Sequence, residues 1–350
     1  MIQEYEESST WAVAIFAARE TPSVLTGTVR ATIAACAGKR ATIDVLINGN
    51  QALAHDFSEI VGTLAAHSCT LRVWSIDTPD KAHTWNEYVH RIWDTEGITY
   101  FIDGYARPKP DALHAIERHL AAKPNAMAAS GVPTSGRSAK KMRETMLRRG
   151  GGIHGNLYAL TASSMKGVKT TSFRLPLGLY RTDPLLGAAL TYRLDPSNNQ
   201  WTRGSVVAVG DATWDVDGIS ELNYKNAIGY FKRRVRQAQG TLESQAFRDH
   251  MSIKRLPPRL LPATAEEMVT NWLKFHPVPA RSLFFKQPLC LYVARQLRKP
   301  RDWSKTQVAP KLLRKHGASA SLLSQRHDSA PGEVLPGGIN QDDEYSLESQ

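Results

Sequence analysis

The chain has few cysteines and no long apolar run. Cys36, Cys69 and Cys290 are widely spaced and form no Cys-x-x-Cys pair, which excludes a disulfide framework and a cysteine-based zinc site. No run approaches the about 18 apolar residues that a transmembrane helix needs. The first residues, MIQEYEESST, are acidic where a secretion signal would be basic and then apolar. We therefore expect a cytoplasmic protein with neither a membrane span nor an export signal.

The rest of the composition is that of a globular protein with excess positive charge. The chain has 350 residues, of which 42% are hydrophobic, enough for one large domain or two modest ones. Its formal net charge is +11, so it should attract anions such as nucleotides, nucleic acid or an anionic membrane. The charge alone suggests a nucleic-acid binder as one possibility. Because no recognition motif accompanies it, we expect no nucleic-acid partner.

Short apolar runs alternate with helical patterns along residues 11–130. The runs read WAVAIFA, ATIDVLI, LRVWSI, ITYFI and NAMAAS. Such alternation is typical of βαβ units. It predicts an α/β fold with a mostly parallel sheet that is covered by helices on both faces.

Three helix starts are marked by proline. Thr21-Pro22 and Thr78-Pro79 each place a capping residue before a proline suited to the first helical turn. Pro110 is expected to act similarly in the fourth unit.

The later segments predict four parts of the chain. Mixed patterns over residues 151–209 complete the α/β domain, and helical stretches over residues 264–275 and 282–299 follow it. Beyond residue 316 the chain is rich in Ser, Gly, Gln and acidic residues, which is typical of disorder. We predict an N-terminal tail (1–10), an α/β domain (11–240), a helical C-terminal extension (241–316) and a disordered tail (317–350).

Unusual polar residues follow four of the predicted strands, at their carboxyl ends. They are Arg19 and Glu20, Asn48-Gly49-Asn50, Asp77, and Asp103-Gly104-Tyr105. Each group alone is typical of an ordinary turn. Because the carboxyl ends of parallel strands share one edge, where ligands bind in open sheets, the four together predict a common site. The positive ends of the following helices favour an anion there.

Several segments resemble, in order, the motifs of family 2 glycosyltransferases. They are AIFAARETPSVL, DVLINGN, DKAHTWNEYV, FIDGYARPKPDAL, GNLYAL and RTDPLL, and they span roughly residues 11 to 240. The resemblance implies a GT-A, Rossmann-like fold. It also implies inverting transfer of a sugar from a nucleoside-diphosphate sugar to a hydroxyl acceptor, in bacterial polysaccharide or glycolipid synthesis. A catalytically inactive relative that binds nucleotide for assembly is the alternative.

The resemblance assigns the donor contacts. In the family, residues matching Ala17, Arg19, Glu20 and Asn48 line the base and ribose, and Lys81 falls in a segment near the phosphates. The alternative for Lys81 is an exposed helix lysine. Asn48 stands where the family usually has aspartate, which removes a charge and leaves hydrogen bonding possible.

Asp103 matches a carboxylate that holds a metal in the resembling family. A Mg²⁺ or Mn²⁺ ion between this carboxylate and the diphosphate would neutralise charge on the leaving group. Tyr105, however, occupies the second aspartate position of the Asp-x-Asp signature. A phenol with a pKa of about 10 is a poor ligand for a hard cation, so the metal would rest on Asp103, diphosphate and water. An aromatic stacking role is the alternative for Tyr105.

Asp183 is the predicted catalytic base. In the resembling family an acidic residue deprotonates the acceptor hydroxyl, and here the pair reads Thr182-Asp183. The alternative is that Asp183 caps a helix beginning at Pro184. Arg233 and Arg236 fall where the family often has a Gln-x-x-Arg-Trp motif, which implies contact with acceptor or diphosphate. This sequence lacks the tryptophan, and a solvated charged face is the alternative.

Three further features have weaker implications. GVPTSGRS, residues 131–138, resembles a P-loop, but Arg137 replaces the lysine and a flexible basic loop is favoured. The histidines, His154 included, show no metal-binding spacing and are expected to be structural or exposed. Residues 282–299 mix large apolar and basic side chains. They could lie peripherally on the inner face of a membrane or pack on the catalytic domain.

Overall fold

The computed structural model of the chain describes residues 10–135, 139–216 and 224–317, which belong to one compact unit. Within it, one sheet has the order β10-β3-β2-β1-β4-β7-β6-β8. Its strands are β1 (Trp11–Ala17), β2 (Ala41–Asn48), β3 (Cys69–Ile76), β4 (Thr99–Asp103), β6 (Ala128–Ser130), β7 (Leu157–Leu160), β8 (Val206–Ala208) and β10 (Lys311–Gly317). Outside this sheet, β5 (Arg107–Pro108) pairs with β9 (Trp214–Asp215).

The strands predicted from the apolar runs are confirmed, and the sheet is mostly parallel. Strand β1 pairs in parallel with β2 and β4, and β2 pairs in parallel with β3. Two strands depart from this pattern. Strand β7 runs antiparallel to β4 and β6, and β10 runs antiparallel to β3 at the edge.

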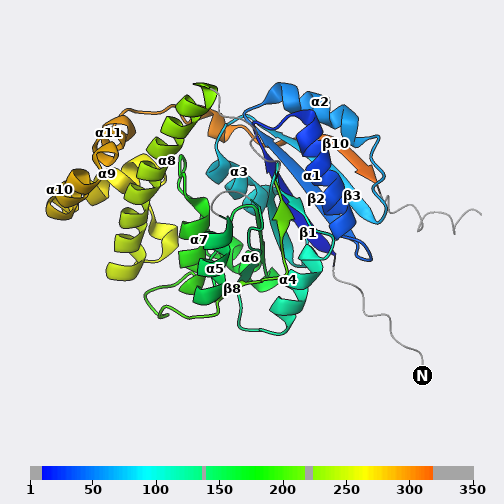
Figure 1. Cartoon of the computed structure of the whole chain (residues 1–350), viewed down its shortest axis with the longest axis horizontal. Helices are drawn as coiled ribbons and strands as arrows, with labels where there is room; N and C mark the ends of the chain where they lie inside the picture. Colours follow the sequence, from blue (N-terminus) through cyan, green and yellow to red (C-terminus); the bar gives the residue numbers. More distant parts are fainter. Residues whose placement is uncertain (1–9, 136–138, 217–223, 318–350) are drawn as a thin grey trace, which may run out of the picture. The chain divides into compact units, whose positions relative to one another are not determined.

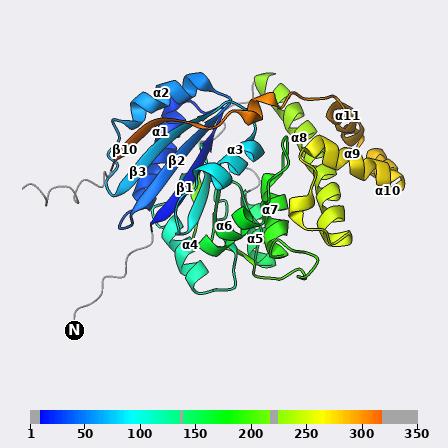
Figure 2. The ribbon, with the colours of Figure 1, turned by 180° about the vertical axis from the view of Figure 1, so that it is seen from behind.

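Helices cover both faces of the sheet. They are α1 (Pro22–Ala35), α2 (Gln51–Val61), α3 (Lys81–Glu87), α4 (Ala112–Ala121), α5 (Ala139–Arg149), α6 (Ala162–Thr170), α7 (Thr182–Thr191), α8 (Tyr224–Arg248), α9 (Ala265–Phe275), α10 (Pro277–Lys286) and α11 (Pro288–Leu297). Because strand side chains alternate between faces, Val13 and Ile15 pack toward α1, α2 and α4, whereas Ala14 and Phe16 pack toward α3, α6, α7 and α8. Figures 1 and 2 show α1 and α2 on one face and α3 on the other.

One predicted helix cap is confirmed and two are wrong. Thr21 caps α1, accepting a hydrogen bond from the Val24 amide at 3.3 Å. Helix α3, however, begins after Asp80, whose carboxylate accepts from the His83 amide at 2.7 Å. Thr78 lies too early, because the charged acceptor nearer the helix takes the cap. Helix α4 likewise begins after Asp111, so Pro110 lies outside it.

The C-terminal part is joined to the α/β domain more closely than the predicted boundary suggests. Helix α8 runs uninterrupted through residue 240. Residues 241–316 contribute β10 to the main sheet, so this part is not purely helical. Figure 2 shows the chain crossing from α11 to the edge strand.

The predicted helical stretch over residues 282–299 is in fact two helices. Helix α10 ends at Lys286 and α11 begins at Pro288, because proline cannot continue the preceding helix. No helix in the described ranges is both long enough and apolar enough to cross a bilayer. The first nine residues, residues 136–138 of the predicted basic loop and nearly all of the predicted disordered tail lie outside the described residues.

Candidate functional site

The carboxyl ends of the central parallel strands meet at one edge of the sheet. Phe16 of β1 lies opposite Asp103 of β4. The Gly104 amide donates to the Phe16 carbonyl at 2.7 Å, which fixes the turn after β4 against the end of β1. This arrangement brings the polar residues after β1 and β4 to the same place.

A lysine and a carboxylate form the centre of this edge. Lys81 is the first residue of α3, and its Nζ lies 2.5 Å from Oδ1 of Asp103. The ammonium also lies 5.7 Å from the centre of the Phe16 ring. Tyr105 donates its hydroxyl to the other Asp103 oxygen, Oδ2, at 3.2 Å. Both oxygens of Asp103 therefore have protein partners.

Further charges act on this pair. Burial lowers the pKa of Lys81, but the nearby carboxylates of Asp103, Asp183 and Glu20 raise it by more, so the amine remains an ammonium at neutral pH. Burial, reinforced by the Asp103 charge, raises the pKa of Tyr105 further above its ordinary value. The phenol is therefore protonated and serves as a hydrogen-bond donor.

Asp183 lies in the first turn of α7, close enough to influence Lys81 and Asp103 electrostatically. Its Oδ1 accepts a hydrogen bond from the Thr182 hydroxyl at 2.9 Å. Its Oδ2 faces Gly155, where an added Cβ would lie only 2.5 Å away. Because α7 begins at Thr182, Asp183 is not a cap before Pro184. The carboxylate depends on glycine at position 155 for its room.

Two residues that sequence reasoning missed complete this group. With its amide oriented to satisfy both ends, Asn156 donates to Asp103 Oδ2 and to the Tyr105 hydroxyl, each at 3.2 Å, and accepts from Trp214 Nε1 at 2.9 Å. The His154 ring lies 4.9 Å from the Trp214 ring. Burial lowers the pKa of His154, although Asp183 and Asp103 oppose this, so the imidazole is neutral at pH 7.

The residues predicted to contact base and ribose lie at the same edge, but their side chains differ in how far they are free to bind a ligand. Ala17 is buried and Asn48 is only 7% exposed. With its amide oriented to satisfy both ends, Asn48 donates to the Ala17 carbonyl at 2.8 Å and accepts from the Asp80 amide at 3.2 Å. The Asn48 side chain therefore connects β1 to the start of α3.

The Glu20 and Arg19 side chains point to different uses. Glu20 Oε2 accepts from the amides of Ala18 and Arg19 at 2.6 and 2.9 Å, so it closes the turn after β1. Arg19 is exposed, and among the described residues its guanidinium has no hydrogen-bond or ion-pair partner. It is a cationic group at this edge that remains available to a ligand.

The two predicted arginines of α8 differ in their link to this site. Arg236 is exposed, and its guanidinium lies 6.0 Å from the ring centre of Tyr180, three residues before Asp183. Arg233 is also exposed, and within the described ranges no contact joins it to the other predicted site residues. The structure thus connects Arg236, but not Arg233, to the loop that leads into α7 and Asp183.

A buried carboxylate holds that loop in place. Glu243 of α8 accepts from the amides of Tyr180 and Arg181 at 2.9 and 3.0 Å, and from Gln239 Nε2 at 2.8 Å. Burial raises the pKa of Glu243, which these hydrogen bonds oppose. Sequence reasoning missed this residue, because it lies past the predicted boundary at residue 240 and looks like any helical glutamate.

The donor set at this edge does not fit a metal ion held by the protein. Among the described residues, no group of three or more His, Cys, Asp and Glu side chains could hold one. Asp103 is ion-paired with Lys81, and the protonated phenol of Tyr105 offers no anionic oxygen. A hard divalent cation needs several free oxygen ligands, and the ammonium of Lys81 would repel it.

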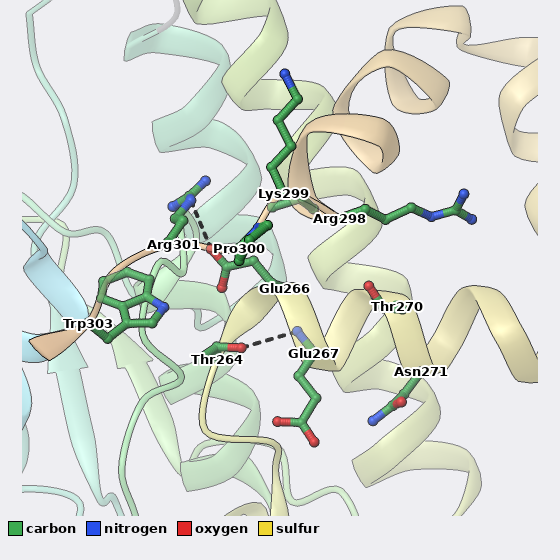
Figure 3. Close-up of a pocket in the computed structure, with 11 residues that line it drawn as sticks. Thr264, Glu266, Glu267, Thr270, Asn271, Arg298, Lys299, Pro300, Arg301 and Trp303 are labelled. Atoms are coloured by element: carbon green, nitrogen blue, oxygen red, sulfur yellow. Dashed lines mark hydrogen bonds and ion pairs between the residues drawn. The ribbon is translucent and has the colours of Figure 1, made fainter.

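A separate pocket of about 390 Å³ lies between α9 and the segment that follows α11. Figure 3 shows Arg301 directed at Glu266, at an Nε to Oε1 distance of 2.9 Å, whereas Arg298 and Lys299 are directed outward. None of the predicted site residues lines it. Arg301 is already paired with Glu266, and we assign this pocket no part in the site at the strand ends.

Comparisons with protein-family models and with curated protein sequences find no match to this chain. Solved structures do match. The mannosyltransferase PcManGT from Pyrobaculum calidifontis, in complex with GDP-Man and Mn²⁺, has a TM-score of 0.51 and 18% identity, covering 82% of this chain and 84% of its own. Glucosyl-3-phosphoglycerate synthase from Mycobacterium tuberculosis has a TM-score of 0.47 and 14% identity, and the match covers 71% of this chain and 81% of the synthase. The first likeness confirms the predicted α/β fold of the GT-A type, whereas membership of family 2 stays a prediction.

Proposed function

We propose that the chain is a glycosyltransferase that moves a hexosyl unit from a nucleoside-diphosphate sugar to a hydroxyl of a glycan or lipid-linked acceptor. The observation that supports this most is the meeting of Lys81, Asp103 and Asp183 at the carboxyl edge of a GT-A sheet. Ligands of open α/β sheets bind in the crevice at this edge. The mannosyltransferase with this fold binds GDP-Man, which favours the same donor class here.

Asp183 acts as the general base in this proposal. It takes the proton of the acceptor hydroxyl while that oxygen attacks the anomeric carbon from the face opposite the diphosphate. The bond from the anomeric carbon to the diphosphate oxygen breaks, and the nucleoside diphosphate leaves with the electron pair. Because the attack comes from the opposite face, the configuration at the anomeric carbon is inverted. Oδ2 of Asp183 accepts no hydrogen bond within the described ranges, which leaves it available for the proton.

Different parts of the edge serve the donor in different ways. Arg19 and the exposed ring of Tyr105 offer a guanidinium and a stacking surface to the nucleotide. Ala17, Glu20 and Asn48 shape the site, because their side chains are buried or bonded to backbone. Arg236, whose guanidinium lies beside the Tyr180 ring, contacts the acceptor or the diphosphate in this proposal, and Arg233 is an exposed cation that meets an anionic acceptor.

The proposal is tested by incubating the full chain with a panel of uridine, guanosine, adenosine and thymidine diphosphate sugars and measuring release of the nucleoside diphosphate. We expect one base to be preferred and release to rise when hydroxyl acceptors are added. Binding of a nucleotide without any turnover across donors and acceptors would instead favour the inactive nucleotide-binding alternative. The polysaccharide or glycolipid pathway stays a prediction.

Membrane contact of residues 282–299 also stays a prediction. Phe285 is 92% exposed beside Lys286, and Tyr292 is 46% exposed, as an interfacial surface requires. Phe284 and Leu289, in contrast, pack against the core. Co-sedimentation with vesicles of anionic lipid, compared with neutral lipid and with Phe285→Ser, decides between the two uses.

A further inference from the structure

The diphosphate of a donor needs positive charge, and at the strand ends the structure supplies a lysine. We propose that the Lys81 ammonium takes the place of a divalent cation in binding the diphosphate, and that Asp103 positions this lysine, so that nucleotide binds without metal. This inference rests on the proposed function, because it concerns the donor site of that reaction. It also changes the expected role of Asp103 from metal ligand to positioning residue.

The contacts of Asp103 support a positioning role. Its Oδ1 accepts from Lys81 at 2.5 Å, and its Oδ2 accepts from the Tyr105 hydroxyl at 3.2 Å. Asn156 adds a donor to the same Oδ2. Only 15% of the Asp103 side chain is exposed, so little of the carboxylate is open to a cation, and the ammonium on Oδ1 would repel one.

The contacts of Lys81 leave it able to bind phosphate. An ammonium has three N–H donors, and hydrogen bonding in the described residues uses one, to Asp103. The side chain is 33% exposed, so its remaining donors can reach a ligand. Lysine is a common phosphate ligand that acts as a point charge.

A second cation at this edge points the same way. Arg19 is exposed, and among the described residues its guanidinium has no hydrogen-bond or ion-pair partner. It can therefore add a second positive charge beside Lys81 for the diphosphate.

The test is calorimetric titration of the full chain with UDP, GDP, ADP and TDP, once in EDTA and once in Mn²⁺. We expect the preferred nucleotide to bind in EDTA, with a dissociation constant within about threefold of that in Mn²⁺. Lys81→Met should weaken binding in EDTA by about tenfold or more, and Lys81→Arg should restore most of it.

A matched control and a reversal sharpen this test. Lys39 also pairs with a carboxylate, Glu117 at 2.9 Å, and lies 5.1 Å from the Trp11 ring centre, so Lys39→Met should leave nucleotide affinity unchanged. The double variant Lys81→Met/Tyr105→Asp frees Asp103 and supplies a second carboxylate. It should acquire metal dependence, binding about tenfold more tightly in Mn²⁺ than in EDTA.

The outcomes separate this inference from the proposed function. Wild-type binding that appears only with Mn²⁺, or Lys81→Met that binds as wild type in EDTA, overturns the lysine proposal and leaves the donor site standing. Binding of no nucleotide under either condition overturns the donor site itself, and the lysine proposal with it. Thermal unfolding of each variant, measured in the same buffers, shows whether a loss of binding reflects a loss of fold.

Discussion

The two ends of β1 carry the same kind of contact in different surroundings. At the amino end, Lys39 pairs with Glu117 at 2.9 Å and lies 5.1 Å from the Trp11 ring centre. At the carboxyl end, Lys81 pairs with Asp103 at 2.5 Å and lies 5.7 Å from the ring centre of Phe16. The exposed fractions are also similar, at 28% for the Lys39 side chain and 33% for that of Lys81.

The difference lies in what surrounds each pair. At the amino end, Trp11 Nε1 also donates to Glu117, at 3.0 Å. The one carboxylate therefore pairs with the lysine and accepts a hydrogen bond from the indole. At the carboxyl end, Lys81 is also influenced by Asp183 and Glu20. A lysine over an aromatic ring is thus ordinary structure in one place. It becomes a candidate site only where further charges and the glycine-lined space beside Asp183 accumulate.

The largest expected effect that separates the two ends is that of Asp183→Asn. The amide cannot accept a proton, so transfer should fall by about 10²- to 10⁴-fold, while nucleotide affinity and the unfolding midpoint stay near wild type. Rates of donor turnover with acceptor, combined with calorimetric binding, measure both. Glu117→Gln, the same kind of change at the amino end, should keep full turnover. Retained transfer in Asp183→Asn would remove this residue as the base.

A smaller loss is expected from Gly155→Ala, which leaves Asp183 itself intact. The new Cβ would lie 2.5 Å from Oδ2, so the carboxylate must move, and a misplacement of about 1 Å can cost about 10²-fold in rate. Gly187→Ala in the same helix as Asp183 is the control, because its Cβ would meet Ile153 at an ordinary 3.7 Å. Steady-state kinetics of both variants check this, and equal activity would show that the position of Asp183 does not matter.

Asp103→Asn and Glu117→Gln form the most direct comparison of the two pairs. Asp103→Asn should lower kcat by about tenfold, because a less firmly held Lys81 stabilises the leaving diphosphate less well. Its nucleotide affinity should change little, since the site also loses a negative charge. Glu117→Gln should lower the free energy of unfolding by about 1 kcal/mol or less, as for other partly exposed pairs, with kcat unchanged. Kinetics and urea unfolding of the two variants measure both effects. An equal change of kcat in the two variants would show that the Lys81–Asp103 pair has no special role compared with the Lys39–Glu117 pair.

The sequence was sufficient to predict the frame of the molecule and the edge at which its unusual polar residues meet. Buried strands such as β1 and β4 are apolar runs bounded by turns, so periodicity locates them, and the parallel order then brings the residues after them together. The edge strand β10 escaped prediction, because KLLRKHG is largely exposed and charged and has no apolar face to reveal it.

The details of the site were beyond the sequence for a different reason. Lys81 and Asp103 are 22 positions apart, and no local pattern shows that the ammonium meets the carboxylate. Asn156 and His154 follow a glycine run in a segment that the sequence assigns only to mixed structure completing the domain. Their proximity to Asp103 and Trp214 depends on the antiparallel insertion of β7 beside β4, which the alternation of runs did not predict.

The smallest expected effect concerns His154, whose pKa responds to Asp183, Asp103 and Lys81 at the carboxyl end of β1. Burial lowers the pKa of His154 below 6.5, although the nearby Asp183 and Asp103 oppose the shift and Lys81 adds to it. A histidine whose pKa is lowered in the folded state contributes stability that is present above the unfolded pKa, about 6.5, and is lost as the pH falls below it. Between pH 7 and pH 5, the free energy of unfolding should therefore fall by more in the wild type than in His154→Gln, with the other histidines titrating alike in both. Urea unfolding across this range measures the difference, and an NMR midpoint for His154 at or above 6.5 would contradict its burial beside Trp214.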